Sequence, residues 1–433
     1  MPEDKPPDKS QKQVPPGPRT IGGVVELFVK QIDALAETLP LSMSAIQGAH
    51  DASREHLLKF LNEECKAIRQ DDEKQTTYTI KPGQQLHFRR LEGRVHKTTL
   101  AKTLVPRGFL VSLISQFDAF LGSLIRQLFK IKPEILNSSA NTLTFSQLSE
   151  FGSIEDAREY VIDKEVESVL RKNHSEQFDW LENKFGMPLR SGLTAWPEFI
   201  EVTERRNLFV HTKGVVSHQY LEVCKRHSCA IDPALCSGMT LSATRDYFES
   251  AHECIFEVGV KLSQVLWRKS APDDLQRADA SLVKVCYELL ADGRNRLARI
   301  LLDFATETLK KHGSKENRLI LVVNRAQAYK WSGDEDTARK IVNAEDWSAT
   351  SVKFQLAHAV LLDDTTTAVH IMKQIGTGEA DITKDAYREW PLFKEIRKSE
   401  VFAAAFEGIF GEPLNTVTIE ATGTPTTTKH PIN

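Results

Sequence analysis

The stretch from Glu204 to Tyr220, E-R-R-N-L-F-V-H-T-K-G-V-V-S-H-Q-Y, holds side chains suited to chemistry on a phosphate. The imidazole of His211 could take a proton from a ribose 2′-hydroxyl or give one to a leaving 5′-oxygen. The guanidinium of Arg206 could hold the phosphate through paired hydrogen bonds and offset the charge that develops on it. The amide of Asn207 could orient the imidazole or bind a phosphate oxygen. Together these groups could support metal-independent cleavage of RNA.

A helix over residues 196–211 is expected to position these groups. Apolar residues recur there at roughly helical spacing, at Phe199, Val202, Leu208 and Phe209. Pro197 is tolerated because it falls in the first turn. Asn207 and His211 are four residues apart and lie on the same face of the helix. Arg206 is five residues before His211, which places it about 140° away around the helix axis, so its side chain must curl round to meet the imidazole. Gly214 suits a C-cap, so the helix is expected to end just after His211.

These residues carry a resemblance to a known family. R-N-L-F-V-H, Arg206 to His211, resembles the Arg-polar-x-x-x-His signature of HEPN domains, an all-helical family that includes toxin, antiviral and RNA-processing ribonucleases. The following G-V-V-S-H-Q-Y-L is similar to the turn and last helix of many bacterial members. Pro106 to Leu128, with the core S-Q-F-D-A-F-L-G-S-L-I-R, resembles their early core helix, and Asp118 stands where an acidic residue often faces the motif arginine. The resemblance covers residues from about 100 to 265.

The resemblance implies an RNA endonuclease that needs no metal and no cofactor. His211 would be the acid or base, Arg206 the phosphate clamp, Asn207 the orienting group and Asp118 the partner that positions Arg206. Attack of a ribose 2′-hydroxyl on its own phosphate would leave a 2′,3′-cyclic phosphate and a free 5′-hydroxyl. Family analogy also implies a homodimer with a composite cleft and a role in toxin-antitoxin or antiviral defence.

Two other interpretations use the same residues. In a non-catalytic scaffold, Arg206 and His211 would make internal hydrogen bonds and Asp118 would be a structural ion-pair partner. In a nucleotide-binding protein, the residues would require a pocket for a base, but no G-x-x-x-x-G-K-[ST] or G-x-G-x-x-G motif occurs. Arg205 is a competing arginine, expected to be a surface charge.

Composition bounds the class of protein. A chain of 433 residues is longer than one core usually needs, so we expect two domains. A content of 41% hydrophobic and 27% charged residues is typical of a soluble globular protein. The net charge of -3 indicates that any RNA surface is local. The N-terminus lacks the apolar core of a signal peptide, and no run of about 18 uncharged apolar residues is present. We therefore expect a cytoplasmic protein without a membrane segment, whose six scattered cysteines are reduced.

The N-terminal part is predicted to consist of a disordered tail (1–20), two amphipathic helices broken at Pro40 (21–69) and a basic insertion (76–107). The insertion begins as a short strand and turn, T-T-Y-T-I-K-P-G. Against the single acid Glu92 it carries seven basic residues, Lys81, Arg89, Arg90, Arg94, Lys97, Lys102 and Arg107. Arg89, Arg90, Arg94 and Lys97 are the candidate RNA-binding residues, although a solvated loop would have the same composition. A strongly apolar helix with Pro106 in its first turn is expected next.

A cluster of thiols and imidazoles follows the motif helix. Thiolate and imidazole groups are good zinc ligands, and four such residues occur here: Cys224, His227, Cys229 and Cys236. Their spacing matches no paired C-x-x-C framework, so we expect reduced thiols near a loop and assign no metal site. Residues 240–267 are predicted to form a long amphipathic helix opening at a Ser or Thr cap, which completes a HEPN-like domain over 21–270.

Residues 276–412 are predicted to form a short α-solenoid. Leu319 to Val342 resembles a tetratricopeptide unit, with small Ala326 where helices approach, Gly333 in the turn and Ala338 on the second helix. The stretches 294–309 and 353–375 resemble neighbouring repeat units less closely. Trp390 and Phe393 in the terminal segment are expected in the core. This solenoid is a candidate site for a protein partner or trigger, and residues 413–433 are expected to be disordered.

Overall fold

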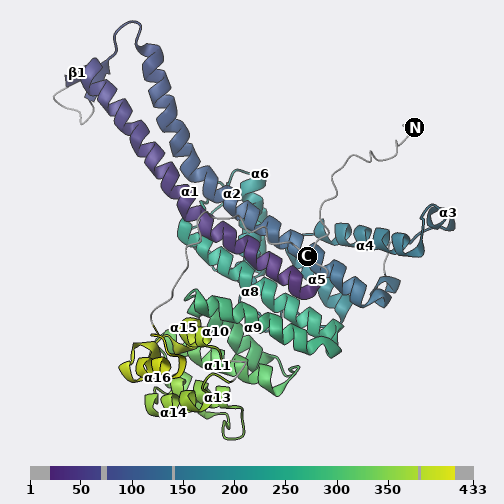
Figure 1. Ribbon diagram of the computed structural model, residues 1–433. Coiled ribbons are helices and arrows are strands. Elements are labelled where there is room, and N and C mark those ends of the chain that lie inside the picture. The colour runs from purple at the N-terminus through teal and green to yellow at the C-terminus, as the bar shows by residue number, and fades with distance from the viewer. Residues whose placement is uncertain (1–19, 70–75, 139–141, 379–381, 415–433) are drawn as a thin grey trace. The chain divides into compact units, whose positions relative to one another are not determined.

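The computed structural model describes residues 20–69, 76–138, 142–378 and 382–414. Helices dominate these ranges, and their only strands are the two-stranded ribbon of β1 and β2, so the expected all-α class is confirmed (Figure 1). The chain forms two compact units, Met1–Leu282 and Val283–Asn433. The boundary between the units falls within α9 (Leu275–Ala291), slightly beyond the boundary that the sequence suggested near residues 270–276.

A long antiparallel hairpin organises the first unit (Figure 1). Its arms are α1 (Ile21–Glu64) and α2 (Gln85–Ile131), and β1 (Lys66–Arg69) pairs with β2 (Thr76–Thr79) at its tip. Thr20 caps α1 by accepting a hydrogen bond from the Gly23 amide.

Both arms differ from the sequence prediction. Pro40 does not break α1, and Pro106 lies well inside α2 instead of in a first turn. An interior proline removes one helical hydrogen bond, which neighbouring packing can offset. Leu39 and Pro106 are both buried, so apolar contacts support the helices at these points. The basic stretch at 85–107 is likewise helical and not a loop. Leu91 is buried there, and the Phe60 ring of α1 packs against His87, with centroids 5.1 Å apart.

The third core helix is α8 (Arg245–Ser270), which packs on both arms of the hairpin. Thr244 accepts a hydrogen bond from the Tyr247 amide, which confirms the predicted Ser or Thr cap. Gly259 allows α8 to approach α1 closely, because a Cβ there would lie 2.4 Å from Cε1 of Phe28. The Phe28 ring stacks on Phe120 of α2 with centroids 4.3 Å apart, so aromatic packing joins the three helices.

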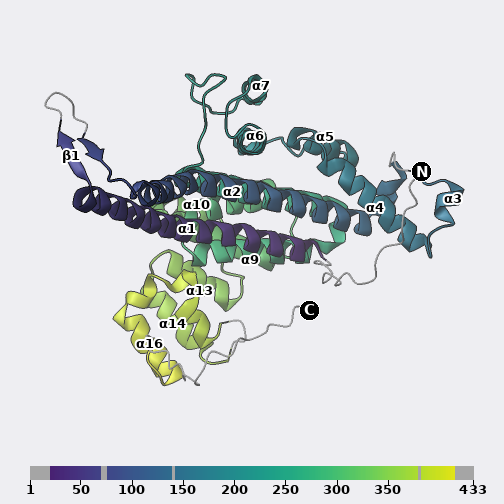
Figure 2. The ribbon, with the colours of Figure 1, turned by 90° about the horizontal axis from the view of Figure 1, so that it is seen from above.

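Shorter helices flank α2 on another side (Figure 2). After η1 (Pro133–Ser138) and α3 (Phe145–Leu148) come α4 (Ile154–Leu170), α5 (His174–Phe185), α6 (Trp196–His211) and α7 (His218–Arg226). Both α4 and α6 pack on α2, and α5 contacts α4 and α6. The turn from α4 to α5 lies beside the C-terminal half of α2, since His174 contacts Asp118 and Leu170 lies against Gly122.

By length and composition, α2 could cross a membrane, a property that the sequence analysis did not expect. Half of its most apolar stretch is buried by protein, and core helices of soluble proteins pass the same test. The feature is therefore weak evidence for a membrane segment.

The second unit consists of short helices joined by tight turns. They are α10 (Asn295–Asp303), η3 (Phe304–Thr308), α11 (Lys315–Trp331), α12 (Glu335–Asn343), α13 (Val352–Leu361), α14 (Thr365–Ile375), α15 (Lys384–Glu389), η4 (Pro391–Phe393), η5 (Ile396–Lys398) and α16 (Glu400–Phe410). Gly333 turns the chain between α11 and α12 at φ +85°, and Ala326 and Ala338 are buried on these two helices. Phe393 is buried in the last cluster and Trp390 is packed against it, as expected. Residues 1–19 and 415–433 lie outside the described residues, so the disorder expected at both ends stays a prediction.

Candidate active site

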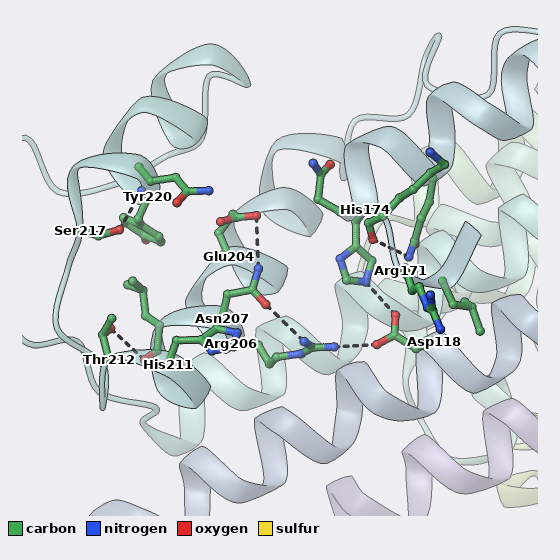
Figure 3. A pocket seen from close by; sticks show the side chains of 16 residues that line it. Asp118, Arg171, His174, Glu204, Arg206, Asn207, His211, Thr212, Ser217 and Tyr220 are labelled. Atoms are coloured by element: carbon green, nitrogen blue, oxygen red, sulfur yellow. Dashed lines mark hydrogen bonds and ion pairs between the residues drawn. The ribbon is translucent and has the colours of Figure 1, made fainter. Parts of the chain in front are cut away.

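An open pocket of about 540 Å³ lies in the first unit, where α2, the α4–α5 turn, α5, α6 and the start of α7 meet (Figure 3). The four residues that the sequence proposed as catalytic, Asp118, Arg206, Asn207 and His211, all line it. They come from two helices that are far apart in the chain.

The helix α6 runs from Trp196 to His211, which matches the predicted range. Its apolar residues, Phe199, Ile200 and Val202 among them, are buried and turn the motif residues towards the pocket. The chain leaves the helix at Gly214, whose amide donates a hydrogen bond to the Leu208 carbonyl (2.9 Å). At φ +88°, a Cβ on Gly214 would lie 2.9 Å from the Leu241 carbonyl oxygen, so this turn requires glycine.

Asp118 and Arg206 form the central ion pair of the pocket. Nη2 of Arg206 donates to Oδ2 of Asp118 at 2.6 Å, and Nη1 donates to Oδ1 of Asn207 at 3.2 Å (Figure 3). The side chains of Arg206 and Asp118 are 20% and 27% exposed, so a ligand could still reach them. Within the described residues, Nε of Arg206 is buried and has no hydrogen-bond partner, so it is not a donor for a ligand. The guanidinium has a fixed orientation, and the second hydrogens of Nη1 and Nη2 remain as donors for an anion.

The direction of Arg206 corrects one detail of the sequence analysis. Its side chain was expected to curl towards His211, but it turns the other way, to Asp118 (Figure 3). The reason is the charge-assisted hydrogen bond to the carboxylate, which an imidazole cannot offer to a guanidinium.

His211 occupies the last position of α6 and is exposed at the pocket edge. Across the described part of the chain, its imidazole makes no hydrogen bond with protein. The exposed ring could therefore exchange a proton with a molecule bound in the pocket.

Glu204 is a pocket residue that the sequence analysis quoted but gave no role. Its Oε1 accepts a weak hydrogen bond from Nδ2 of Asn207 at 3.5 Å, which helps to orient the amide. Burial raises the pKa of Glu204, although the nearby charge of His174, the hydrogen bond from Asn207 and the charge of Arg206 act in the opposite direction.

His174 is the functional candidate that sequence reasoning missed. It is the first residue of α5, behind the N-cap Asn173, and its Nε2 lies 3.0 Å from Oδ1 of Asp118. Its ring packs against Phe117 and Phe199. The Asn173 cap could have indicated a helix start. No local pattern, however, could reveal a contact across 56 positions of chain.

Arg205 is not the surface charge that the sequence analysis expected. Its Nε donates to Oε1 of Glu201 at 2.7 Å, and its guanidinium lies 3.9 Å from the ring centroid of Tyr247. The hydroxyls of Tyr220 and Tyr247 also donate to Glu201, at 2.6 and 2.7 Å. Since Glu201 is buried, this network satisfies its charge and gives Arg205 a structural role.

The candidate RNA-binding residues do not line the pocket. Arg89, Arg90, Arg94 and Lys97 are all exposed, but they lie on the half of α2 near the hairpin tip. Even Lys97 is about 30 Å from Asp118 along the helix, at 1.5 Å per residue. The two groups could contact one ligand only if that ligand were extended.

The cysteine cluster after α6 is not arranged for metal. In the described ranges no group of three or more His, Cys, Asp or Glu side chains could hold an ion, and all six cysteines are free thiols. His227 is engaged elsewhere, because Nδ1 accepts a hydrogen bond from the Trp196 indole at 3.3 Å.

Compared with known proteins, the chain matches no family model, no curated protein and no solved structure.

Proposed function

We propose that the protein is a metal-independent RNA endonuclease of the HEPN type. The observation that carries this proposal is that an oriented guanidinium, an amide and a solvent-exposed imidazole line one pocket. Arg206 binds the scissile phosphate and offsets the charge of its transition state, while Asp118 and Asn207 hold the guanidinium in place. His211 serves as a proton donor or acceptor. The products are a 2′,3′-cyclic phosphate and a 5′-hydroxyl.

The access of His211 favours this proposal over the scaffold interpretation. In a purely structural site, Arg206 and His211 would both be expected to make internal hydrogen bonds. Arg206 does, but His211 is exposed and has no hydrogen-bond partner among the described residues. The scaffold remains the second candidate, because the Asp118–Arg206 ion pair alone would suit it.

The wider role follows from the resemblance and is part of the same proposal. The first unit is a HEPN-like bundle that forms a homodimer, and the second is a short tetratricopeptide-like α-solenoid that receives a protein partner or trigger. We place the enzyme in the cytoplasm, in a toxin-antitoxin or antiviral defence role, because a free ribonuclease would harm its own cell.

Replacing His211 by alanine tests the proposal. We expect RNA cleavage to fall by about 10²- to 10⁴-fold, the usual contribution of general acid–base catalysis. Folding should be unchanged because the imidazole is exposed and outside the core. The measurement is the rate of total-RNA and tRNA loss with purified proteins. His218→Ala is the matched control, since His218 is also exposed but does not line the pocket. Equal RNA loss with wild type and His211→Ala would remove the catalytic assignment.

A further inference from the structure

Cleavage by a 2′-hydroxyl requires two proton transfers. The attacking hydroxyl must lose a proton as the bond from O2′ to phosphorus forms, and the leaving O5′ must gain one as its bond to phosphorus breaks. A single histidine supplies one of these transfers at a time. The pocket should therefore contain a second group that can exchange a proton.

The hydrogen-bonding geometry of His174 fits this need. Its Nε2 faces Oδ1 of Asp118 at 3.0 Å, and a carboxylate accepts hydrogen bonds, so the ring proton lies on Nε2. When the ring is neutral, the other nitrogen, Nδ1, carries a lone pair. Figure 3 shows this nitrogen on the side of the ring that faces Glu204 and Asn207. Among the described residues, no hydrogen-bond donor occupies it.

The surroundings of His174 keep the imidazole in this orientation. The side chain is 8% exposed and packs against the rings of Phe117 and Phe199, with centroid distances of 6.1 and 5.6 Å. A carboxylate on one nitrogen and aromatic walls fix both the tautomer and the ring plane. In hydrolases that pair Asp with His, the same arrangement prepares the distant nitrogen to act as a base.

Asp118 also connects His174 to the phosphate clamp. One carboxylate oxygen faces His174 and the other accepts from Arg206, at 3.0 and 2.6 Å. A phosphate bound by the remaining hydrogens of Nη1 and Nη2 of Arg206 would consequently lie near the imidazole of His174. His211 lines the same pocket from the last turn of α6.

We propose that His174 is the general base of the reaction and His211 its general acid, an assignment that rests on the proposed function. Nδ1 of His174 takes the 2′-hydroxyl proton as O2′ bonds to phosphorus. Protonated His211 gives its proton to O5′ as the P–O5′ bond breaks. His174 ends protonated and His211 neutral, and exchange with water restores both. A single chain thus carries both proton-transfer groups.

A glutamine at position 174 separates catalysis from structure. In His174→Gln the side-chain amide can still donate to Asp118 and hold Arg206, but it cannot accept a proton. We expect the cleavage rate to fall by about 10²- to 10⁴-fold while RNA binding and the unfolding midpoint stay near wild type. His252→Gln is the matched control, because His252 is also buried and Nε2 lies 2.9 Å from Asp33, away from the pocket.

A substrate with sulfur in place of the bridging O5′ identifies the acid and the base. A thiolate leaves without receiving a proton, so this short RNA, built on a sequence that wild type cuts, should restore cleavage by His211→Ala to within about tenfold of wild type. His174→Gln should remain slow on the same substrate. Cleavage of the ordinary RNA by His174→Gln at the wild-type rate, or its rescue by sulfur, overturns the assignment while leaving the proposed function intact. Absence of cleavage by wild type on both substrates overturns the proposed function and the assignment together.

Discussion

At the scale of single residues, the pocket depends on one carboxylate that serves two neighbours. Asp118 accepts from Arg206 on Oδ2 and faces His174 with Oδ1, so a change at Asp118 would alter the surroundings of both side chains. The sequence indicated the pair of Asp118 and Arg206 through its resemblance to a family pattern. It could not indicate His174, because that contact depends on where the α4–α5 turn meets α2.

Glu204 gives a prediction about pH. Burial raises its pKa, so the ionised carboxylate is less favourable in the folded than in the unfolded protein. The contribution of Glu204 to stability is therefore greatest below the ordinary carboxyl pKa and is lost as the pH rises through the raised value. Glu204→Gln removes the penalty, so it should increase the free energy of unfolding at pH 8 relative to wild type, with a smaller difference at pH 4.

Urea unfolding at the two pH values measures this effect. Glu222→Gln is the control, since Glu222 is exposed on α7 and should change stability by less than about 0.5 kcal/mol. An equal difference between wild type and Glu204→Gln at pH 4 and pH 8 would contradict the burial argument.

At the scale of elements, the helix boundaries show what sequence patterns can and cannot predict. α6 matches its predicted range, and α8 was predictable in kind, although it spans Arg245–Ser270 instead of 240–267. Apolar spacing, a capping threonine and a turn glycine all act locally. The continuous hairpin arms were not predictable, because Pro40 and Pro106 are local signals for a break. Packing between α1, α2 and α8 along both arms outweighs those signals, and it is absent from any short window of sequence.

The close approach of α8 and α1 can be tested at Gly259. Alanine there would bring a Cβ to 2.4 Å from Phe28, and the buried ring has little room to move. We expect Gly259→Ala to destabilise the protein by about 1–3 kcal/mol, the usual cost of overpacking. Gly93→Ala is the matched control in another helix: no atom lies within 4 Å of the added Cβ, so it should stabilise by about 0.5–1 kcal/mol.

Thermal or urea denaturation of the two variants provides the comparison. If Gly259→Ala were as stable as Gly93→Ala, the claim that α8 and α1 are in tight contact at Gly259 would be contradicted.

At the scale of the whole molecule, the near-neutral net charge means that the proposed RNA binding would use local cations. The exposed basic residues of α2 are the strongest local group in the first unit that the sequence analysis identified. Their distance from the pocket, about 30 Å or more along α2, fits contacts with the backbone of an extended RNA and excludes a direct part in the chemistry.

The salt dependence of RNA affinity tests this role. Each phosphate contact with a single strand contributes about 0.7 to the slope of log K against log salt. Replacing Arg89, Arg90, Arg94 and Lys97 by glutamine should therefore reduce the slope by up to about 3 and weaken binding without changing the product ends. The control replaces four exposed cations of the second unit, Arg339, Lys340, Lys373 and Lys394. An unchanged slope for the hairpin variant, or an equal change in the control, would show that the basic residues are simply solvated.

The measurement that tests the central claim most directly is the chemistry of the RNA ends. Purified wild type and His211→Ala are incubated with a tRNA pool in EDTA, and the product termini are mapped. Our account predicts fragments with 2′,3′-cyclic phosphate and 5′-hydroxyl ends from wild type alone. Cleavage that requires a divalent metal, 5′-phosphate ends, or identical fragments from His211→Ala would contradict it.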